Sequence, residues 1–401
     1  MPLKIYVAGG TGLVGSAIIK KLRERGHTNI LSTFHRGRPQ DDTVNWHQLD
    51  LTDQHAVLGY FRATKPDWVF LAAAKVGGIG ANNQYRANFL YDNLQIQNNI
   101  IHSSFQCGVA KLLFLGSSCI YPRNCRQPIK EEYLLTDRLE YTNEPYAVAK
   151  ITGMKLCESF NLQYGTNFVA VMPTNLYGPG DNFDLETSHV VSALIRKFHL
   201  GKCLEQDDWN NLRADLNARP ISGIDGTFSA ESILNLLSEH GISIVNEESQ
   251  NNREQRRSSS FSTFSNASVR LWGTGTPRRE FLHVDDLAEA CCFIMEKADF
   301  KELAAMREKE LNQKDIEIKN IRNTHVNIGY GSDLSIKQLA EMIKSVCGFQ
   351  GRLVWDNSMP DGTPRKLLNV NRIKSLGWKP LIGLKEGIQG TYEWYLLNQN
   401  E

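Results

Sequence analysis

Short apolar runs alternate with amphipathic stretches through the first third of the chain, and this alternation predicts a parallel β-sheet. An apolar run at residues 4–8 ends in glycines, and residues 13–25 then carry apolar side chains at helical intervals. Further strands are predicted at 30–34, 46–49, 68–72 and 112–116, and further helices at 54–63, 88–106 and 145–163. The pattern predicts the α/β class, with a doubly wound parallel sheet and a smaller C-terminal α/β domain.

Two segments of the C-terminal half interrupt this pattern. Residues 203–268 are polar, with one helical patch at 230–240, and their end carries too few apolar side chains to be predicted as ordered. This segment is a lid, a partner-binding element or a tolerated surface extension. Residues 299–324 place apolar side chains at helical intervals between charges, which is compatible with a solvated surface helix or with a partner-binding one.

The balance of acidic and basic residues argues against two classes of binding partner, nucleic acids and anionic membranes. The chain has 401 residues, with 45 Lys and Arg against 44 Asp and Glu, so electrostatics predicts neither a nucleic-acid nor an anionic-membrane partner. No apolar run is long enough to cross a membrane, and the opening MPLKIYVAGG is typical of a strand and a turn rather than of a signal peptide. The eight cysteines lack C-x-x-C spacing, which predicts reduced thiols, no metal site and a cytoplasmic location.

Glycines mark the junction between the first predicted strand and the first helix, in the sequence GGTGLVG. Glycine there permits a tight turn, close approach of the backbone to a diphosphate and close packing of helix on strand, and the helix N-terminus supplies N–H donors. We therefore predict a dinucleotide site in a Rossmann-like fold. Its first residues are Gly9, Gly10, Thr11, Gly12, Leu13, Val14 and Gly15.

The end of the second predicted strand favours NADP over NAD. An NAD site usually has Asp or Glu there, but residues 34–38 read FHRGR, with no acid before Asp41. Arginine suits a 2′-phosphate, so Arg36 is the predicted contact, and Asp50 and Leu51 after the third strand are placed to border the adenine. The basic loop at 35–43 is long, which leaves the strictness of this preference open.

The dinucleotide site belongs to the first part of the chain. We predict an NADP-binding Rossmann domain at residues 1–172, to which residues 280–298 return. A substrate-binding domain is predicted at residues 173–401, with insertions at 203–268 and 299–324.

Tyr146 and Lys150 lie four apart in the predicted helix that begins at Pro145, and so share one face. An ammonium beside a phenol favours the phenolate, so Lys150 is expected to lower the pKa of Tyr146 and make it a usable acid or base. The helix follows a strand that ends in Gly116, Ser117 and Ser118, where active sites of open α/β sheets lie. Ser, Tyr and Lys in this arrangement resemble the extended short-chain dehydrogenase/reductase superfamily.

Six ordered motifs extend the resemblance to the GDP-L-fucose synthase family. They are GSSCIYP at 116–122, NEPYAVAK at 143–150, MPTNLYGPGDNF at 172–183, SHV at 188–190, WGTGTPRREFLHVDD at 272–286 and PDGTPRKLLNV at 360–370. The resemblance implies NADPH-dependent 4-reduction and 3,5-epimerisation of GDP-4-keto-6-deoxy-D-mannose to GDP-L-fucose. It also implies a homodimer, through helices near 88–106 and 145–163.

The resemblance assigns roles to particular residues. Ser117 and Tyr146 would hydrogen-bond the O4 oxygen, Cys119 would be the base and His189 the acid of epimerisation, and Lys150 would also hold the nicotinamide ribose. Cys119 stands two residues after Ser117, where strand alternation would put both side chains on one face. The alternative for Cys119 is a small buried apolar residue, and for His189 a capping or surface residue.

The remaining predicted contacts line the cofactor and the GDP-sugar. Cofactor contacts are also predicted at Leu115, Gly116, Ser117, Ser118, Lys150, Pro173, Thr174, Asn175, Leu176 and His189. Arg279 is the candidate for the diphosphate and Trp272 for a stacking or apolar wall, with Lys197, Asp361 and Lys366 completing the predicted substrate pocket.

Two other functions compete with this one. A relative could act on another GDP-keto-sugar, such as a colitose or heptose precursor, because the sugars differ by one hydroxyl or carbon. A non-catalytic NADP-binding regulator would be expected to have lost catalytic side chains, whereas Ser117, Cys119, Tyr146, Lys150 and His189 are all present.

Overall fold

The computed structural model describes the chain except residues 1, 245–266, 312–316, 318–319, 360 and 399–401. The predicted disorder at the end of segment 203–268 falls almost wholly on residues 245–266 and so lies outside the described residues. The chain divides into two compact units, and it passes back and forth between them. Unit 1 comprises residues 1–180, 279–333 and 365–384; unit 2 comprises residues 181–278, 334–364 and 385–401.

Unit 1 is built on a seven-stranded parallel sheet with the order β12-β6-β5-β4-β1-β2-β3. Its strands are β1 (Ile5–Ala8), β2 (Ile30–Phe34), β3 (Asn45–Gln48), β4 (Trp68–Leu71), β5 (Lys111–Leu115), β6 (Phe168–Pro173) and β12 (Val326–Ile328). The central strands are apolar and buried throughout, as a parallel sheet covered on both faces requires. The predicted α/β class and doubly wound sheet are confirmed.

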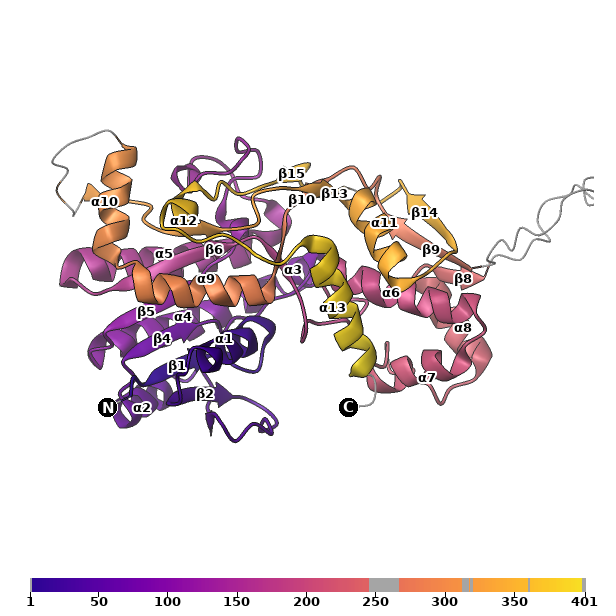
Figure 1. The fold of residues 1–401 in the computed structure, drawn as a ribbon, viewed down its shortest axis with the longest axis horizontal. Helices are drawn as coiled ribbons and strands as arrows, with labels where there is room; N and C mark the ends of the chain where they lie inside the picture. Colours follow the sequence, from indigo (N-terminus) through magenta and orange to yellow (C-terminus); the bar gives the residue numbers. More distant parts are fainter. Residues whose placement is uncertain (1, 245–266, 312–316, 318–319, 360, 399–401) are drawn as a thin grey trace, which may run out of the picture. The chain divides into compact units, whose positions relative to one another are not determined.

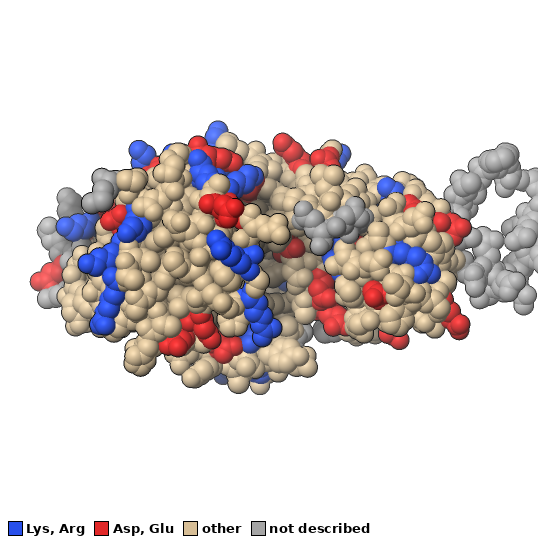
Figure 2. All heavy atoms as spheres, turned by 90° about the horizontal axis from the view of Figure 1, so that it is seen from below, with Lys and Arg blue, Asp and Glu red and all other residues tan. Residues whose placement is uncertain are grey.

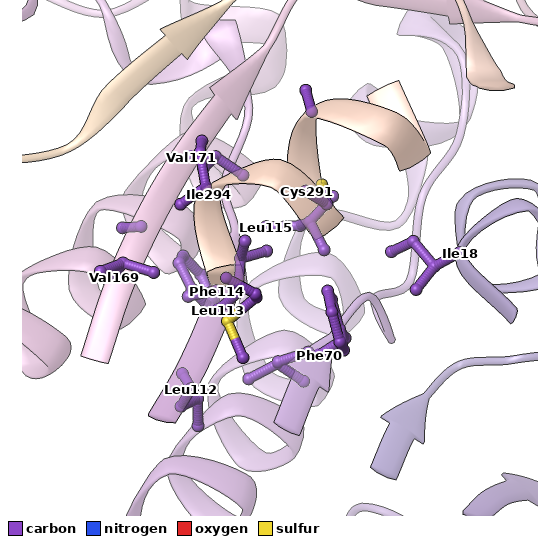
Figure 3. Packing of buried hydrophobic residues seen from close by; sticks show 14 of the residues in the cluster. Ile18, Phe70, Leu112, Leu113, Phe114, Leu115, Val169, Val171, Cys291 and Ile294 are labelled. Atoms are coloured by element: carbon purple, nitrogen blue, oxygen red, sulfur yellow. The ribbon is translucent and has the colours of Figure 1, made fainter. Parts of the chain in front are cut away.

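Helices cover both faces of this sheet (Figure 1). The helices of unit 1 are α1 (Leu13–Glu24), α2 (Gln54–Thr64), α3 (Ile79–Gln84), α4 (Arg86–Gln106), α5 (Glu144–Tyr164), α9 (Val284–Lys297), α10 (Phe300–Glu310) and α12 (Asn371–Ser375). α1 packs against α9, and α4 packs against α5. In Figure 3, Cys291 and Ile294 of α9 lie against Phe114, Leu115 and Val171 of the sheet, within one continuous apolar core.

Short elements complete unit 1 near the ends of the strands. A parallel pair is formed by β7 (Asn175–Tyr177) and β11 (Phe281–His283). Three 3-10 turns, η1 (Ser118–Ile120), η2 (Glu131–Tyr133) and η3 (Tyr141–Asn143), lie in the connection from β5 to α5, and β15 (Arg365–Lys366) follows the return of the chain from unit 2.

Unit 2 is a smaller α/β unit. Strands β8 (Ile242–Ile244), β9 (Ala267–Trp272) and β14 (Arg352–Asp356) form a three-stranded sheet with β9 in the centre. The other elements are α6 (Val190–Glu205), α7 (Trp209–Ala218), α8 (Ala230–Glu239), β13 (Leu334–Ser335), α11 (Ile336–Cys347) and α13 (Leu384–Leu397), while β10 (Arg278–Arg279) lies where the chain returns to unit 1.

The described parts of the two expected insertions belong to the cores of the units. Residues 203–244 form the end of α6, then α7, α8 and β8, and Asp215 of α7 is fully buried. In residues 299–324, α10 buries one face with Phe300 and Leu303 and exposes Lys301 and Glu302 on the other. The first unit also extends to Gly180, beyond the expected boundary at residue 172.

Acidic and basic side chains are interspersed on the face drawn in Figure 2, as the near-neutral charge predicts. Across the described part of the chain, every helix is too short or too polar to cross a membrane.

Candidate functional site

The glycine loop between β1 and α1 has the geometry that a diphosphate site requires. Gly9 has a φ of +87°, and a Cβ added there would lie 2.7 Å from the backbone nitrogen of Ala73. A Cβ on Gly15 would lie 2.0 Å from the carbonyl oxygen of Gly9, so only glycine lets α1 pack this closely on the turn. Gly12 caps α1 without a side-chain hydrogen bond, which leaves the first N–H groups of the helix for an anion.

A hollow of about 210 Å³ lies beside this loop. Its lining consists of Gly9, Thr11, Thr33, Phe34, His35, Leu49, Asp50, Leu51, Thr52 and Ile96. The Asp50 Oδ1 atom accepts hydrogen bonds from the backbone nitrogen (2.9 Å) and hydroxyl (2.7 Å) of Thr52, which lower the pKa of the carboxyl and fix it at the end of β3. The predicted Arg36 is exposed and is not part of this lining.

Sequence reasoning missed most of this lining. The predicted set contained Gly9, Thr11, Asp50 and Leu51 from it. The other lining residues lie in or near the ends of β2 and β3, except Ile96, which lies on α4. The signal that was available is the strand order, since the carboxyl ends of neighbouring parallel strands share one edge of the sheet.

Ser117 and Cys119 lie just beyond the carboxyl end of β5. The strand ends at Leu115, and Ser117 then caps the 3-10 turn η1, its Oγ accepting a hydrogen bond from the Cys119 backbone nitrogen at 3.3 Å. The alternation argument for Cys119 is therefore wrong, because the backbone there turns instead of extending. At Gly116 a Cβ would lie 2.2 Å from the sulfur of Met172, so a larger residue would force the buried Met172 side chain to move.

Tyr146 and Lys150 lie on α5, which packs against η1. The Lys150 ammonium donates a hydrogen bond to the carbonyl oxygen of Leu115 at 2.8 Å, and its Nζ lies 5.8 Å from the centroid of the Tyr146 ring. Burial lowers the pKa of Lys150 to about 8. The ring of Phe89, which was not predicted, lies edge-on to Tyr146 with 6.4 Å between centroids and forms an apolar wall.

The expected lowering of the Tyr146 pKa is not found. Burial raises this pKa well above its ordinary value, and the neighbouring Cys119 raises it further. Lys150 directs its hydrogen bond to a carbonyl of β5, so desolvation of the phenol dominates. The protonated phenol is the form that can donate a proton.

Cys119 is buried, and burial raises its pKa. Lys366, the hydrogen bond with Ser117 and Lys150 act in the opposite direction and favour the thiolate. Lys366 itself has a lowered pKa because of burial, and Arg279 adds to that lowering. Lys366 and Arg279, two of the predicted substrate residues, belong to unit 1, as Cys119 does.

Four predicted site residues belong to unit 2. His189 is exposed at the N-cap of α6, and Trp272 is 71% exposed at the end of β9. The Lys197 ammonium donates to the carbonyl of His240 at 2.7 Å, and burial lowers its pKa to about 8. The Asp361 carboxylate accepts two hydrogen bonds from Thr274.

The predicted residues at the end of β6 meet Glu280. The Thr174 hydroxyl and the Asn175 amide donate to the Glu280 carbonyl oxygen at 3.2 Å and 2.8 Å. Pro173 ends β6, and Leu176 lies in the middle of β7. These bonds fix the segment just beyond the sheet edge at which Ser117 lies.

Known proteins are similar to this chain over nearly its whole length. The model of the NAD dependent epimerase/dehydratase family matches residues 5–217 and 238–306. GDP-L-fucose synthase 1 of Arabidopsis thaliana is 43% identical over 98% of this chain and 94% of its own. GDP-L-fucose synthase of Escherichia coli is 41% identical over 99% of this chain and 98% of its own.

A solved structure of MlghC, a GDP-mannoheptose C4 reductase from Campylobacter jejuni with NADP bound, is also similar. It has a TM-score of 0.76 and 39% identity, and 98% of each chain is covered. The family match and the identities above 40% over nearly full length confirm the resemblance to the GDP-L-fucose synthases, and the chain belongs to the NAD dependent epimerase/dehydratase family.

Proposed function

We propose that the protein is a bifunctional enzyme that converts GDP-4-keto-6-deoxy-D-mannose to GDP-L-fucose, by 3,5-epimerisation and NADPH-dependent reduction at C4. The observation that carries this proposal is the gathering of Ser117, Cys119, Tyr146 and Lys150 at the end of β5. It occurs in a chain that is at least 41% identical to two GDP-L-fucose synthases over almost all of its length.

The glycine loop, the uncapped start of α1 and the hollow beside them fit a dinucleotide. NADPH supplies a hydride to C4 when it is bound. Tyr146 donates a proton to O4, and its raised pKa keeps the phenol protonated for this purpose. Lys150 holds the ribose of the nicotinamide, and its bond to Leu115 fixes its position relative to Tyr146.

Epimerisation uses the acidity that the C4 ketone confers on the hydrogens at C3 and C5. Ser117 and Tyr146 stabilise the O4 enolate by hydrogen bonds. Cys119 removes each proton as its thiolate, which Lys366 and Lys150 favour against the effect of burial. His189 delivers the proton on the opposite face of the sugar.

Basic and aromatic side chains bind the GDP portion. Arg279 pairs with the diphosphate, for which a guanidinium offers two parallel donors, and Lys366 adds a second positive charge. Trp272, with most of its ring exposed, offers an apolar wall. Lys197 and Asp361 of unit 2 are further proposed contacts of the substrate.

The test is to supply GDP-4-keto-6-deoxy-D-mannose and NADPH, follow NADPH absorbance and identify the sugar by NMR. Formation of GDP-L-fucose supports the proposal, and absence of turnover contradicts it. Tyr146→Phe should lower NADPH oxidation by about 10²- to 10⁴-fold, because the proton donor is lost, while cofactor binding measured by fluorescence is preserved. Turnover at the wild-type rate would refute the acid role.

A related GDP-keto-sugar reductase or epimerase is the second candidate. It is favoured by the similarity to the GDP-mannoheptose C4 reductase MlghC, at 39% identity. Parallel assays with the 6-deoxy, 3,6-dideoxy and heptose 4-keto substrates, each followed to its product by NMR, decide between them through kcat/KM.

We further propose a cytoplasmic homodimer that pairs through α4 and α5. Tyr91 on α4 and Val148 and Tyr164 on α5 leave 63%, 39% and 53% of their surface exposed, an unusual amount of apolar area for two helices that pack side by side. Light scattering should give the dimer mass, and Val148→Glu should shift it toward the monomer. A monomeric wild type would exclude the dimer.

A further inference from the structure

Tyr121, two residues after Cys119, ends in a buried polar cluster that the proposed chemistry does not use. The tyrosine is 3% exposed, and its hydroxyl contacts two side chains from the β12 region. It donates to the Asn327 Oδ1 atom at 2.5 Å and lies 2.9 Å from the His325 Nε2 atom. All three residues are buried within unit 1.

The direction of each of these hydrogen bonds can be assigned. The Asn327 amide nitrogen donates to the carbonyls of Ile129 (3.0 Å) and Asn369 (3.3 Å), so its oxygen must accept from Tyr121. The tyrosine has then used its proton, and the His325 Nε2 atom must donate to it. Burial lowers the pKa of His325 well below its usual value, so the ring is neutral with its one proton on Nε2.

The cluster continues into an ion network. The Asn327 backbone nitrogen donates to the Glu131 carboxylate at 3.1 Å, and Glu131 lies 4.0 Å from the Arg372 guanidinium. Arg372 forms two bonds with Glu310 at the end of α10, of 3.1 Å and 2.6 Å, and donates to the carbonyl of Asn323 at 2.9 Å. The segment from Tyr121 to Glu131 is therefore attached to β12, α12 and α10 at the same time.

This attachment bears directly on Cys119. The cysteine lies in the middle of η1, one short turn between Ser117, which follows β5, and Tyr121. One end of the turn is fixed by the sheet, and the other is fixed by the Tyr121 hydroxyl. Lys150, by contrast, is held by its own bond to the Leu115 carbonyl of β5.

We propose that Tyr121 is a positioning residue for Cys119: its hydroxyl, held by Asn327 and His325, fixes the thiol for proton abstraction at C3 and C5. The inference rests on the proposed function, and it predicts that loss of the hydroxyl impairs epimerisation more than hydride transfer.

The experiment measures the two half-reactions separately in Tyr121→Phe. Epimerisation is followed by mass spectrometry as deuterium uptake from D₂O into GDP-4-keto-6-deoxy-D-mannose without NADPH. Hydride transfer is followed as reduction of NADP by GDP-L-fucose, which needs no epimerisation. In Tyr121→Phe, the rate of deuterium uptake divided by the rate of hydride transfer should fall about tenfold or more. Small displacements of a reacting group slow its reaction by this factor. A role in folding alone would scale both rates equally.

Tyr6→Phe is the matched control. Its buried hydroxyl contacts Thr33 at 3.0 Å between β1 and β2, so removing it deletes an equivalent hydrogen bond away from η1 and should leave the ratio unchanged. His325→Leu is the second variant. It removes one of the two partners of the Tyr121 hydroxyl and leaves Asn327, so it should lower the ratio less than Tyr121→Phe does.

The outcomes separate the two proposals. A wild type without deuterium uptake and without hydride transfer contradicts the proposed function. An active wild type, with unchanged ratios in Tyr121→Phe and His325→Leu, overturns the positioning role. If Tyr121→Phe does not fold, the ratio in His325→Leu decides.

Discussion

Lys150 and Arg372 are two buried cations of unit 1 that the protein treats in opposite ways. Lys150 is 4% exposed and Arg372 is 3% exposed. Lys150 gives one hydrogen bond to a neutral carbonyl, and burial lowers its pKa to about 8. Burial also disfavours the charge of Arg372, but Glu131 and Glu310 outweigh it and raise the pKa above its usual value.

The difference separates charges that hold the fold from charges held for a ligand. Arg372 is satisfied by carboxylates of the chain itself, so its charge is already neutralised. Lys150 keeps a partly uncompensated ammonium at the end of β5, and the shift of its pKa from 10.5 to about 8 corresponds to a cost of roughly 3 kcal/mol. A cost of this size is typical of catalytic positions, where a substrate or cofactor completes the environment.

The largest effect is expected from Arg372→Met. It leaves the buried Glu131 carboxylate without its cation and removes one of the two arginines that pair with Glu310, which keeps Arg307, so it should lower the free energy of unfolding by about 3–5 kcal/mol. Urea denaturation measures this change. Lys20→Met, which breaks the more exposed pair with Asp285, is the control and should cost less than about 1 kcal/mol. Equal losses of unfolding free energy in the two variants would show that the buried ion pair stabilises the fold no more than the exposed one.

Lys150→Met should change the free energy of unfolding in the opposite direction. It should raise the free energy of unfolding at pH 7 by up to about 3 kcal/mol while it abolishes NADPH oxidation. Because the folded-state pKa is lowered, the cost of the ammonium is fully present below about pH 8 and disappears as the pH rises toward 10.5. The stability difference from wild type should therefore shrink over that interval. A destabilised variant at pH 7 would show that Lys150 is structural.

The pH dependence of proton exchange offers a third comparison. Burial raises the pKa of Cys119 above its ordinary value of 9.0, so deuterium uptake should increase about tenfold per pH unit up to at least pH 9. Cys119→Ser should remove this dependence together with most of the uptake, whereas cofactor binding is retained. Exchange in Cys119→Ser at the wild-type rate would exclude the cysteine as the base.

The smallest effect is expected from Glu310→Gln. Arg372 keeps Glu131 and two backbone carbonyls, so the loss of one partly exposed carboxylate should cost about 1–2 kcal/mol. Thermal unfolding measures it. A loss as large as that in Arg372→Met would mean that α10 alone neutralises the arginine.

Patterns of apolar residues predicted the fold because the sheet is held by burial. The central strands β1, β4 and β6 are continuous apolar runs, and such runs are visible in one sequence. The helix α7 was not recognised, because its sequence is polar: its buried face consists of Leu212, Leu216 and Asp215, and Asp215 pairs with Arg196 at 3.0 Å. A buried ion pair leaves no periodic signal, so the segment was taken for an insertion.

The site also contains residues that the sequence predicts and residues that it does not. Gly9, Gly15, Tyr146 and Lys150 are predictable because local backbone geometry and helical spacing require them. The surroundings of Tyr121 are not predictable, because they consist of residues near positions 131, 310, 325 and 372. These positions are far apart in the sequence, and only the tertiary fold brings them together. The pKa directions of Tyr146 and Lys150 also depend on burial, which spacing does not reveal.

The passage of the chain between the two units has a consequence for synthesis on the ribosome. Unit 1 receives its last residues, 365–384, only after nearly the whole of unit 2 has been made. Tyr121 emerges early, but its partners at 325 and 327 and the arginine at 372 follow some two hundred residues or more later. The nascent chain must therefore carry the loop of Cys119 unsupported for most of translation, and no truncated product should hold that loop in its final form.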